Sequence, residues 1–420
     1  MTLLDRTQAP PFRLSSDYSL VPPELFLAGD IKVFAFRGLQ QDVVRLELIF
    51  DAGKWYEPLL GVSQFTSQML SKGTRTKNSF QIAEGLDSLG AHLEISPGFD
   101  VVTLSLFALR KNLIAAMNIL VELLQSPSFD EDELRIMKEI FSQNLRVNNE
   151  KTSVVASKEI RKAIFGEAHP YGSSVEEADV KQIQQEDLQK FFQTQFSLQT
   201  AFLVGRLSDQ EVQSLIGLLS PLVLTTDKYK TDNPAFLRTS QAPPRPKSVQ
   251  ASIRLGKKCL PKSDGPEYFD AAMFNHVLGG FFGSRLMKNI REEKGLTYGI
   301  YSSLNHFLHD SFWVIGAEVN QQNAGMAIEE IRNEIRKLKQ ELISGAELEI
   351  ARNYFIGSWQ SENSTLFSVA EKVKSRHLWA LSENYYTHLL THLQEITPLQ
   401  IQAAANTYFD DADLYEVQVG

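Results

Sequence analysis

The chain has 420 residues, and because one hydrophobic core rarely organises so long a chain, we expect two or more domains. A composition of 43% hydrophobic and 22% charged residues is ordinary for a soluble globular protein, and the formal net charge of -9 argues against a nucleic-acid partner. Cys259 is the only cysteine, which excludes an intramolecular disulfide and a cysteine-based zinc site. Residues 1–14 lack a signal-peptide run, and no segment reaches the roughly 20 apolar residues of a membrane span. We therefore expect a cytoplasmic protein without a membrane partner.

In the first half of the chain, the spacing of apolar residues predicts an order of strands and helices. Alternation of apolar and polar residues predicts half-buried strands, and an apolar residue every three or four positions predicts helices. The predicted strands are residues 31–36, 43–50, 91–96 and 101–107, of which the last two form a hairpin. The predicted helices are residues 61–70, 79–89, 110–125, 131–147 and 153–165.

Much of this order recurs in the second half. The predicted strands are residues 248–255, 297–304 and 312–319, and the predicted helices are residues 268–278, 323–343, 346–359 and 365–380. The helix at 323–343 carries four basic residues interleaved with apolar and acidic ones, namely Arg332, Arg336, Lys337 and Lys339. We interpret them as a solvated helix face rather than a nucleic-acid-binding patch.

The two halves end alike, which indicates duplication of a domain. Four positions of the first half match positions 213 residues later: Ile183, Gln189 and Phe196 recur as Ile396, Gln402 and Phe409, and Leu188 is matched by Ile401. An apolar strand follows each copy, at 201–205 and 414–420. Strands followed by helices predict an α+β fold of two homologous domains, each an antiparallel sheet packed with several helices. We place the domains at 1–222 and 248–420, with a polar, proline-bearing linker at 223–247.

The helix predicted at 61–70 has the frame of a metal-binding helix without its ligands. In the H-x-x-E-H signature of inverted zinc peptidases, two imidazoles and a general-base carboxylate lie on one helical face. Here those positions are Gln64, Ser67 and Gln68. A neutral amide is a poor zinc ligand, and a serine hydroxyl does not take a proton from a metal-bound water as glutamate does. The helix is therefore not expected to hold zinc.

The residues around this helix resemble the M16 family of pitrilysin and mitochondrial-processing-peptidase-like proteins. They are Asp51-Ala52-Gly53, Glu57-Pro58, Lys72-Gly73-Thr74, Leu86-x-x-Leu89-Gly90 and His169-Pro170-Tyr171-Gly172. The resemblance covers essentially the whole chain and implies two α+β domains of the M16 type. It also implies a third zinc ligand within a pair of glutamates seven residues apart on a later helix, a pair that we place at Met137 and Asn144. Neither residue is a zinc ligand, so we expect no metal or other cofactor in this chain.

A second motif is complete. The string Ser284-Arg285-Leu286 leads to Arg291-Glu292-Glu293-Lys294-Gly295-Leu296-Thr297-Tyr298. By the family resemblance, Arg291 and Tyr298 match the pair that hydrogen-bonds the substrate backbone beside the zinc of an opposing domain. Gly295 fits the left-handed end of a helix, which places Arg291 in the last turn and Tyr298 at the start of the next strand. Taken singly, the arginine pairing with a glutamate and the tyrosine packing in a sheet would be ordinary alternatives.

These observations predict a non-catalytic subunit of a heterodimeric M16B-type zinc peptidase. A partner chain with an intact H-x-x-E-H would supply zinc and the general base, and the substrate would be a peptide or unfolded polypeptide bound extended against a sheet edge. A homodimer of the isolated chain stays open. The alternative is a structural or peptide-binding subunit of a larger assembly without a proteolytic role. A self-sufficient peptidase with other ligands is disfavoured, because His388 and His392 lack an intervening carboxylate and a third ligand.

Overall fold

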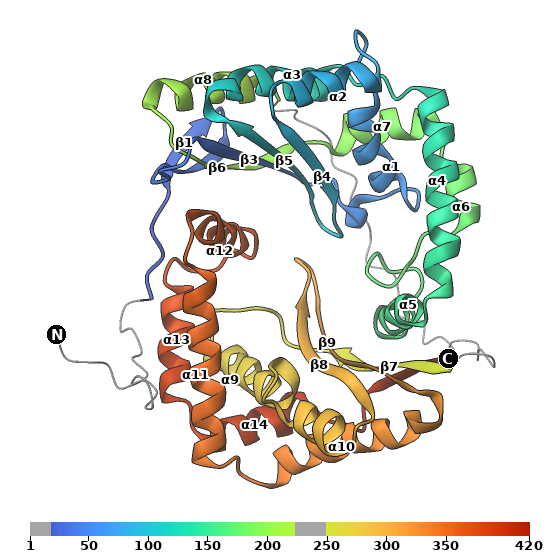
Figure 1. Cartoon of the computed structure of the whole chain (residues 1–420), viewed down its shortest axis with the longest axis vertical. Helices are drawn as coiled ribbons and strands as arrows, with labels where there is room; N and C mark the ends of the chain where they lie inside the picture. The colour runs from blue at the N-terminus through green and yellow to red at the C-terminus, as the bar shows by residue number, and fades with distance from the viewer. Residues whose placement is uncertain (1–17, 223–248) are drawn as a thin grey trace, which may run out of the picture.

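The first half of the chain forms a six-stranded sheet covered by helices (Figure 1). The computed structural model describes residues 18–222 and 249–420. The strands are β1 (Glu24–Ala28), β2 (Ile31–Phe36), β3 (Val43–Phe50), β4 (His92–Pro97), β5 (Val102–Leu109) and β6 (Leu198–Val204), in the order β1-β2-β6-β3-β5-β4. The α-helices are α1 (Val62–Met69), α2 (Ser79–Ser88), α3 (Leu113–Gln125), α4 (Glu131–Glu150), α5 (Thr152–Phe165), α6 (Glu177–Gln182), α7 (Gln185–Gln195) and α8 (Asp209–Leu219). Short 3-10 turns are η1 (Lys54–Tyr56), η2 (Leu70–Lys72), η3 (Arg110–Asn112) and η4 (Ser220–Leu222).

The second half forms a four-stranded sheet with its own helices. The strands are β7 (Gln250–Lys258), β8 (Thr297–His306), β9 (Ser311–Asn320) and β10 (Tyr415–Val419), in the order β10-β7-β9-β8. The α-helices are α9 (Pro266–Asn275), α10 (Ala324–Gln340), α11 (Gly345–Glu362), α12 (Leu366–Leu378), α13 (Tyr385–Glu395) and α14 (Pro398–Tyr408). Two segments, η5 (His276–Gly280) and η6 (Met287–Glu293), are π-type helix, and η7 (Gln321–Asn323) is a 3-10 turn.

The first sheet is not wholly antiparallel, which corrects the sequence-based expectation. β2 runs parallel to β6, with Lys32 opposite Thr200, while β3 pairs antiparallel with both β5 and β6. Parallel neighbours require a long crossover, and here the crossover is the whole stretch between β2 and β6. Alternation of apolar residues predicts that a segment is a strand, but it does not choose the direction of the partner.

The duplication is visible in the topology. The order β6-β3-β5-β4 in the first sheet corresponds to β10-β7-β9-β8 in the second, strand for strand. α7 and α14 occupy the same place before the last strand of each half and start 213 residues apart. Among the described residues, β1 and β2 have no counterpart in the second sheet, which is therefore two strands narrower.

One helix from each half packs on the sheet of the other half. α5, from the first half, packs on β7 and β10, where Ile160 and Ile164 share an apolar cluster with Val417 and Val419. α12, from the second half, packs on β6 of the first sheet. Its apolar residues Val369, Ala370 and Val373 cluster with Phe36, Ile49, Phe202 and Val204. The sheet of the first half is thus buried on both faces, which accounts for the nearly continuous apolar runs of β3 and β6.

Ion pairs reinforce the contact made by α12. Arg45 and Glu47 point from β3 toward this helix, where Arg45 pairs with Glu371 at 2.8 Å and Lys374 pairs with Glu47 at 3.1 Å. Arg45 and Glu47 are buried, so each charge needs a partner to offset its loss of hydration. The two halves are therefore joined by both apolar and ionic contacts.

A second contact between the halves involves the tip of the β8–β9 hairpin. The Tyr171 hydroxyl donates to Asp100, whose other oxygen accepts the Leu308 amide at 2.9 Å, and the His309 amide donates to the Tyr171 oxygen at 3.3 Å. Gly172 follows Tyr171 in a close turn, where a Cβ would lie 2.0 Å from the Gly166 carbonyl oxygen. The His-Pro-Tyr-Gly string thus holds the second half against the first.

The linker predicted at 223–247 lies outside the described residues. Among the helices of residues 18–222 and 249–420, none has the length and apolar character needed to cross a lipid bilayer.

Candidate functional site

Helix α1 presents its two glutamines on one side, as the H-x-x-E-H frame predicts. The helix starts after Gly61, which has φ +93°, and the Glu57 carboxylate accepts the Ser63 amide at 3.0 Å in the first turn. Gln64 and Gln68 are half-buried and face a cavity. Ser67 is fully buried, and its hydroxyl donates to the Ser63 carbonyl at 2.7 Å. The position of the general base is therefore turned into the core.

The cavity lies between α1, β4 and α4 and has a volume of about 530 Å³. Met137 and Asn144 of α4 line it together with Gln64 and Gln68. The structure thus brings together both candidate imidazole positions and the α4 pair, although they are more than 60 residues apart in the chain. Glu139, a carboxylate of the same helix, instead pairs with Arg135 at 3.6 Å on the outer surface.

The residues of this cavity do not fit zinc. Its polar lining includes amides, and the rest is largely apolar, from Leu93, Ile95, Ile136, Ile140 and Phe141. The single lining carboxylate, Glu133, accepts the Ser79 hydroxyl at 2.6 Å. No group of three or more His, Cys, Asp and Glu side chains able to hold a metal occurs in the described parts of the chain. Such a lining is suited to contacts with peptide side chains and not to metal chemistry.

The Arg291 and Tyr298 segment has the local structure expected from its sequence. Arg291 lies in η6, Gly295 has φ +61°, and Tyr298 is the second residue of β8. The register of β8 on β9 shifts between Thr297 and Ile300, so Tyr298 stands in a bulge at a sheet edge. Its side chain is 95% exposed, and the alternative of a tyrosine packed in the sheet is wrong.

Arg291 is held by an aromatic ring instead of a carboxylate. Its guanidinium carbon lies 4.6 Å from the centre of the exposed Phe282 ring. Within the residues that the structure describes, Arg291 forms no ion pair, whereas the nearby Arg285 pairs with Glu347 at 2.8 Å. Stacking on a ring orients the guanidinium and leaves its donors free for another acceptor.

Free sheet edges lie on facing sides of the two halves. β4 and β8 are the end strands of their sheets, each with one edge unpaired among the described strands. Figure 1 places β4 and the β8–β9 hairpin on the inner sides of the two halves, toward each other. His92 and Glu94 are exposed on β4. All residues lining the cavity beside Gln64 lie between 64 and 148, so Arg291 and Tyr298 are not part of it.

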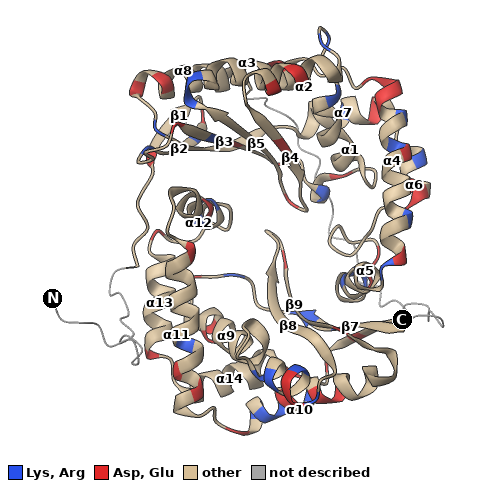
Figure 2. Ribbon diagram, in the orientation of Figure 1, with Lys and Arg blue, Asp and Glu red and all other residues tan. Residues whose placement is uncertain are grey.

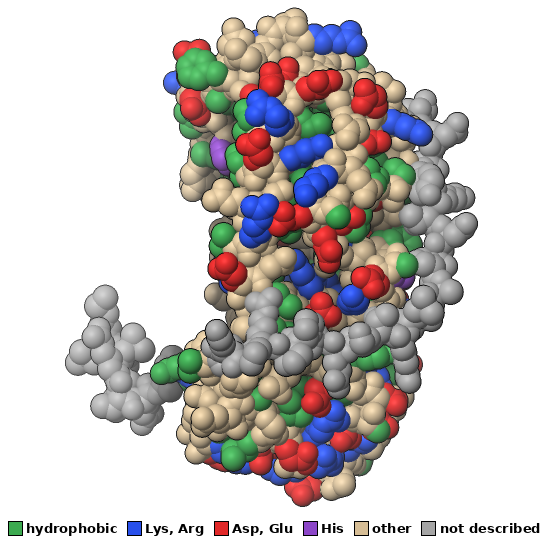
Figure 3. Space-filling model, turned by 90° about the vertical axis from the view of Figure 1, so that its right-hand side faces the viewer, with side chains coloured by type: hydrophobic (Ala, Val, Ile, Leu, Met, Phe, Trp, Pro, Cys, Tyr) green, Lys and Arg blue, Asp and Glu red, His purple; other side chains and the backbone are tan. Residues whose placement is uncertain are grey.

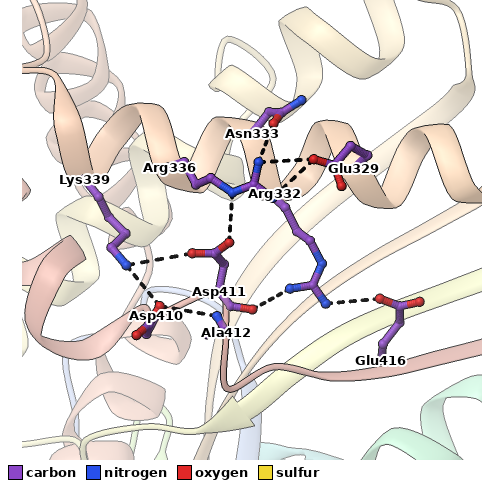
Figure 4. A network of polar contacts seen from close by, with 9 residues as sticks. All are labelled: Glu329, Arg332, Asn333, Arg336, Lys339, Asp410, Asp411, Ala412 and Glu416. Carbon is purple, nitrogen blue, oxygen red and sulfur yellow. Dashed lines mark hydrogen bonds and ion pairs between the residues drawn. The ribbon is translucent and has the colours of Figure 1, made fainter.

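Three of the four basic residues of α10 take part in a network of ion pairs, whereas Lys337 is exposed, as the interpretation of a solvated face expects. Arg336 donates to Asp411 at 3.1 Å, Lys339 pairs with Asp410 at 3.0 Å, and Arg332 pairs with Glu416 at 3.1 Å (Figure 4). Figure 2 shows charges of both signs along α4 and α10, and Figure 3 shows acidic and basic side chains interspersed on the face that carries α4.

The histidines of α13 have structural partners. His388 Nδ1 lies 3.0 Å from Asp264, and His392 Nε2 lies 2.6 Å from Asp270. Each imidazole thus has a different carboxylate, and the pair does not converge on one point.

Sequence reasoning missed a group of basic residues beside Gln64. Lys158 and Arg161, on α5, line a smaller cavity together with Lys54. Their spacing of three residues on a helix was the available signal, because such residues share a face.

Comparisons with known proteins agree with this fold. A family model described as insulinase (peptidase family M16) matches residues 33–179, and one described as peptidase M16 inactive domain matches residues 182–355. The non-peptidase homolog YmxG of Helicobacter pylori is 23% identical over 371 residues, covering 84% of this chain and 83% of the relative. The uncharacterized zinc protease YmxG of Bacillus subtilis is 23% identical over 302 residues, covering 71% and 73%.

Solved structures show the same architecture. The peptidase M16 inactive domain from Pseudomonas fluorescens has a TM-score of 0.83 at 23% identity, covering 95% of this chain and 98% of that one. A protease from Helicobacter pylori has a TM-score of 0.81 at 17% identity, covering 95% and 100%. With the two family models spanning most of the chain and with Gln64, Ser67 and Gln68 at the H-x-x-E-H positions, the chain belongs to the M16 peptidase family as an inactive member.

Proposed function

We propose that this chain is the non-catalytic subunit of a heterodimeric M16B-type zinc peptidase. A catalytic M16 partner with an intact H-x-x-E-H supplies zinc and the general base. This chain supplies Arg291 and Tyr298, which donate hydrogen bonds to carbonyl oxygens of the bound peptide and stabilise negative charge that develops there.

The observation that carries this proposal is the contrast between the two motifs. The metal positions Gln64, Gln68 and Asn144 have no ligand chemistry, whereas Arg291 and Tyr298 are present with donors directed away from their own core. A nearly fully exposed tyrosine beside an arginine without a carboxylate partner among the described residues is typical of a surface that meets another molecule, since both residue types dominate binding hot spots.

The substrate of this complex is an extended peptide or an unfolded segment of a polypeptide. The unpaired edges of β4 and β8 offer main-chain donors and acceptors, which add an extended strand without regard to its sequence. The cavity of about 530 Å³ beside β4 offers apolar contacts to side chains of that strand.

The test is reconstitution with the M16 subunit that co-purifies with this chain. Cleavage of an unstructured peptide should require both chains, and Arg291→Ala should lower the turnover without changing assembly or the zinc content of the partner. If no zinc-bearing M16 chain co-purifies, or if Arg291→Ala and Tyr298→Phe both match wild type in kcat and KM, a structural subunit without a proteolytic role is the better description.

A further inference from the structure

A second cavity, of about 260 Å³, lies next to the first one and is rich in positive charge. Gln64 and Phe141 line both cavities. Three cationic side chains line the smaller cavity, namely Lys54, Lys158 and Arg161. One carboxylate, Glu57, lines it as well. With Glu57 ionised, the lining therefore keeps an excess of positive charge.

None of these cations has a carboxylate within ion-pair distance among the described residues. Lys54 Nζ donates to the Ser173 carbonyl at 2.5 Å, and Lys158 Nζ donates to Asn149 at 2.9 Å. The Arg161 guanidinium lies 5.6 Å from the centre of the Phe99 ring, and its Nε is buried without a hydrogen-bond partner in the described structure. A buried donor that lacks an acceptor is costly, and an incoming anion would provide one.

Glu57, which precedes α1, acts electrostatically on Lys54 but can offset only one of the three positive charges. One of its oxygens accepts the Ser63 amide at 3.0 Å, and the other is buried without a described partner. Burial raises the pKa of Glu57 to about 7 and lowers the pKa of Lys54 to about 8. Burial also lowers the pKa of Arg161, and the pKa of Lys158 is lowered by burial and by the nearby Arg161. Each cation is thus held where its charge is penalised, which a bound anion would relieve.

The edge strand β4 connects the two cavities. Leu93 and Ile95 line the larger cavity, and Pro97 lines the smaller one. These residues alternate along the strand, so an extended peptide paired with β4 places side chains on that same face at intervals of about 7 Å. A peptide whose side chain enters the cavity at Gln64 and Gln68 can therefore place a neighbouring group at Lys158 and Arg161.

We propose that the smaller cavity is a subsite for a carboxylate of the bound peptide, from an acidic side chain or from its C-terminus. This inference rests on the proposed binding of an extended peptide. It gives this chain a role in choosing the substrate that is separate from the hydrogen bonds donated by Arg291 and Tyr298.

The probe is a set of fluorescently labelled, otherwise uncharged peptides, each measured by anisotropy with the full chain. One peptide has a single Glu and an amidated C-terminus, one has no Glu and a free C-terminal carboxylate, one has neither, and one has a single Lys and an amidated C-terminus. The Glu peptide or the free-acid peptide should bind on the order of tenfold more tightly than the neutral one, the scale of a favourable charge interaction in a partly buried site. The peptide that gains shows which carboxylate the subsite accepts.

Variants locate the preference. Lys158→Gln and Arg161→Gln should remove it, while Lys162→Gln should keep it, because Lys162 lies on the same helix but pairs with Glu167 at 3.0 Å outside the cavity. Equal affinity for all four peptides, or a preference for the Lys peptide through Glu57, would overturn the inference while leaving peptide binding intact. Absence of binding for every peptide would overturn both the inference and the peptide-binding part of the proposed function.

Discussion

The two halves place different residues at the same point of the same fold. In each half a helical segment ends at a left-handed glycine, Gly90 with φ +59° or Gly295 with φ +61°, and an edge strand follows. Four residues before and three residues after the glycine are Leu86 and Leu93 in the first half, but Arg291 and Tyr298 in the second. The first pair packs in or against the core, and the second pair includes the most exposed aromatic residue among the described ones.

The helices that follow the first long strand also differ. α1 keeps two polar residues turned toward an open cavity, whereas α9 of the second half is built into the core through Tyr268, Phe269, Met273 and Phe274. A duplicated fold therefore positions a site by its backbone, and the chemistry depends on a few side chains that the fold does not require. The first half has a cavity at the positions of a metal site but lacks the metal ligands. The second half has exposed hydrogen-bond donors, from Arg291 and Tyr298.

The largest change should come from restoring ligands to the first half. Wild type should hold no stoichiometric zinc, and Gln64→His, Gln68→His and Asn144→Glu together should bind about one zinc per chain, since three protein ligands suffice for such a site. Metal analysis after dialysis checks this. Gln64→His and Gln68→His without the α4 change should bind zinc more weakly.

Two results would contradict this view of the first half. If wild type binds about one zinc per chain, the metal must be held by residues other than those at positions 64, 68 and 144. Absence of zinc on the triple variant, with its fold intact by circular dichroism, would mean that Asn144 is not the third ligand position.

The next effect concerns the donors of the second half. Arg291→Leu and Tyr298→Leu, which give the second half the residues of the first, should each lower the rate of the reconstituted peptidase roughly 100 to 1,000-fold, the scale for losing one donor to a developing oxyanion. Steady-state kinetics on an unstructured peptide separates this from a rise in KM alone, which would indicate that the pair only holds the ground-state peptide. Arg291→Lys should retain only part of the peptidase rate, because the single charged ammonium group of lysine does not reproduce the planar set of guanidinium donors.

A smaller effect is expected at the contact that joins the halves. Tyr171→Phe leaves the buried Asp100 without one donor and the His309 amide without its acceptor, so the free energy of unfolding should fall by about 1–3 kcal/mol. Urea unfolding measures the loss. Tyr354→Phe is the control, because Tyr354 is half-exposed and its hydroxyl forms no hydrogen bond among the described residues, and a change within about 0.5 kcal/mol is expected. Equal losses would show that the Tyr171 contact does not hold the halves together.

The smallest effect is the pH dependence of the carboxylate preference. The charged groups facing this cavity or acting on its residues are Lys54, Glu57, Lys158, Glu159, Arg161, Glu176 and Asp179. As pH rises from 6 to 9, Glu57 with a pKa of about 7 gains negative charge, and Lys54 with a pKa of about 8 loses positive charge. Both changes weaken binding of a carboxylate, so the preference for the Glu peptide should decline on the order of tenfold or less. A preference that grows with pH would contradict this assignment, and the neutral peptide serves as the control.

Much of the fold and part of the site follow from the sequence alone. The helix at α1, the β4–β5 hairpin, the left-handed Gly295 and the lost identities at Gln64, Ser67 and Gln68 are encoded by residues close together in the chain. Periodicity, turn residues and the presence or absence of a ligand side chain are local properties, so they can be recognised without knowing the partners.

Only the tertiary structure decided how these elements meet. It paired β2 with β6 in parallel, exchanged α5 and α12 between the halves, gathered Gln64, Gln68 and Asn144 around one cavity, and placed Lys54 beside Arg161. Each of these contacts joins residues far apart in the chain. Which distant elements come into contact depends on the total apolar surface that both sheets bury. A local sequence pattern cannot predict these contacts. It determines which face of a strand or helix is apolar, but not which distant element will cover that face.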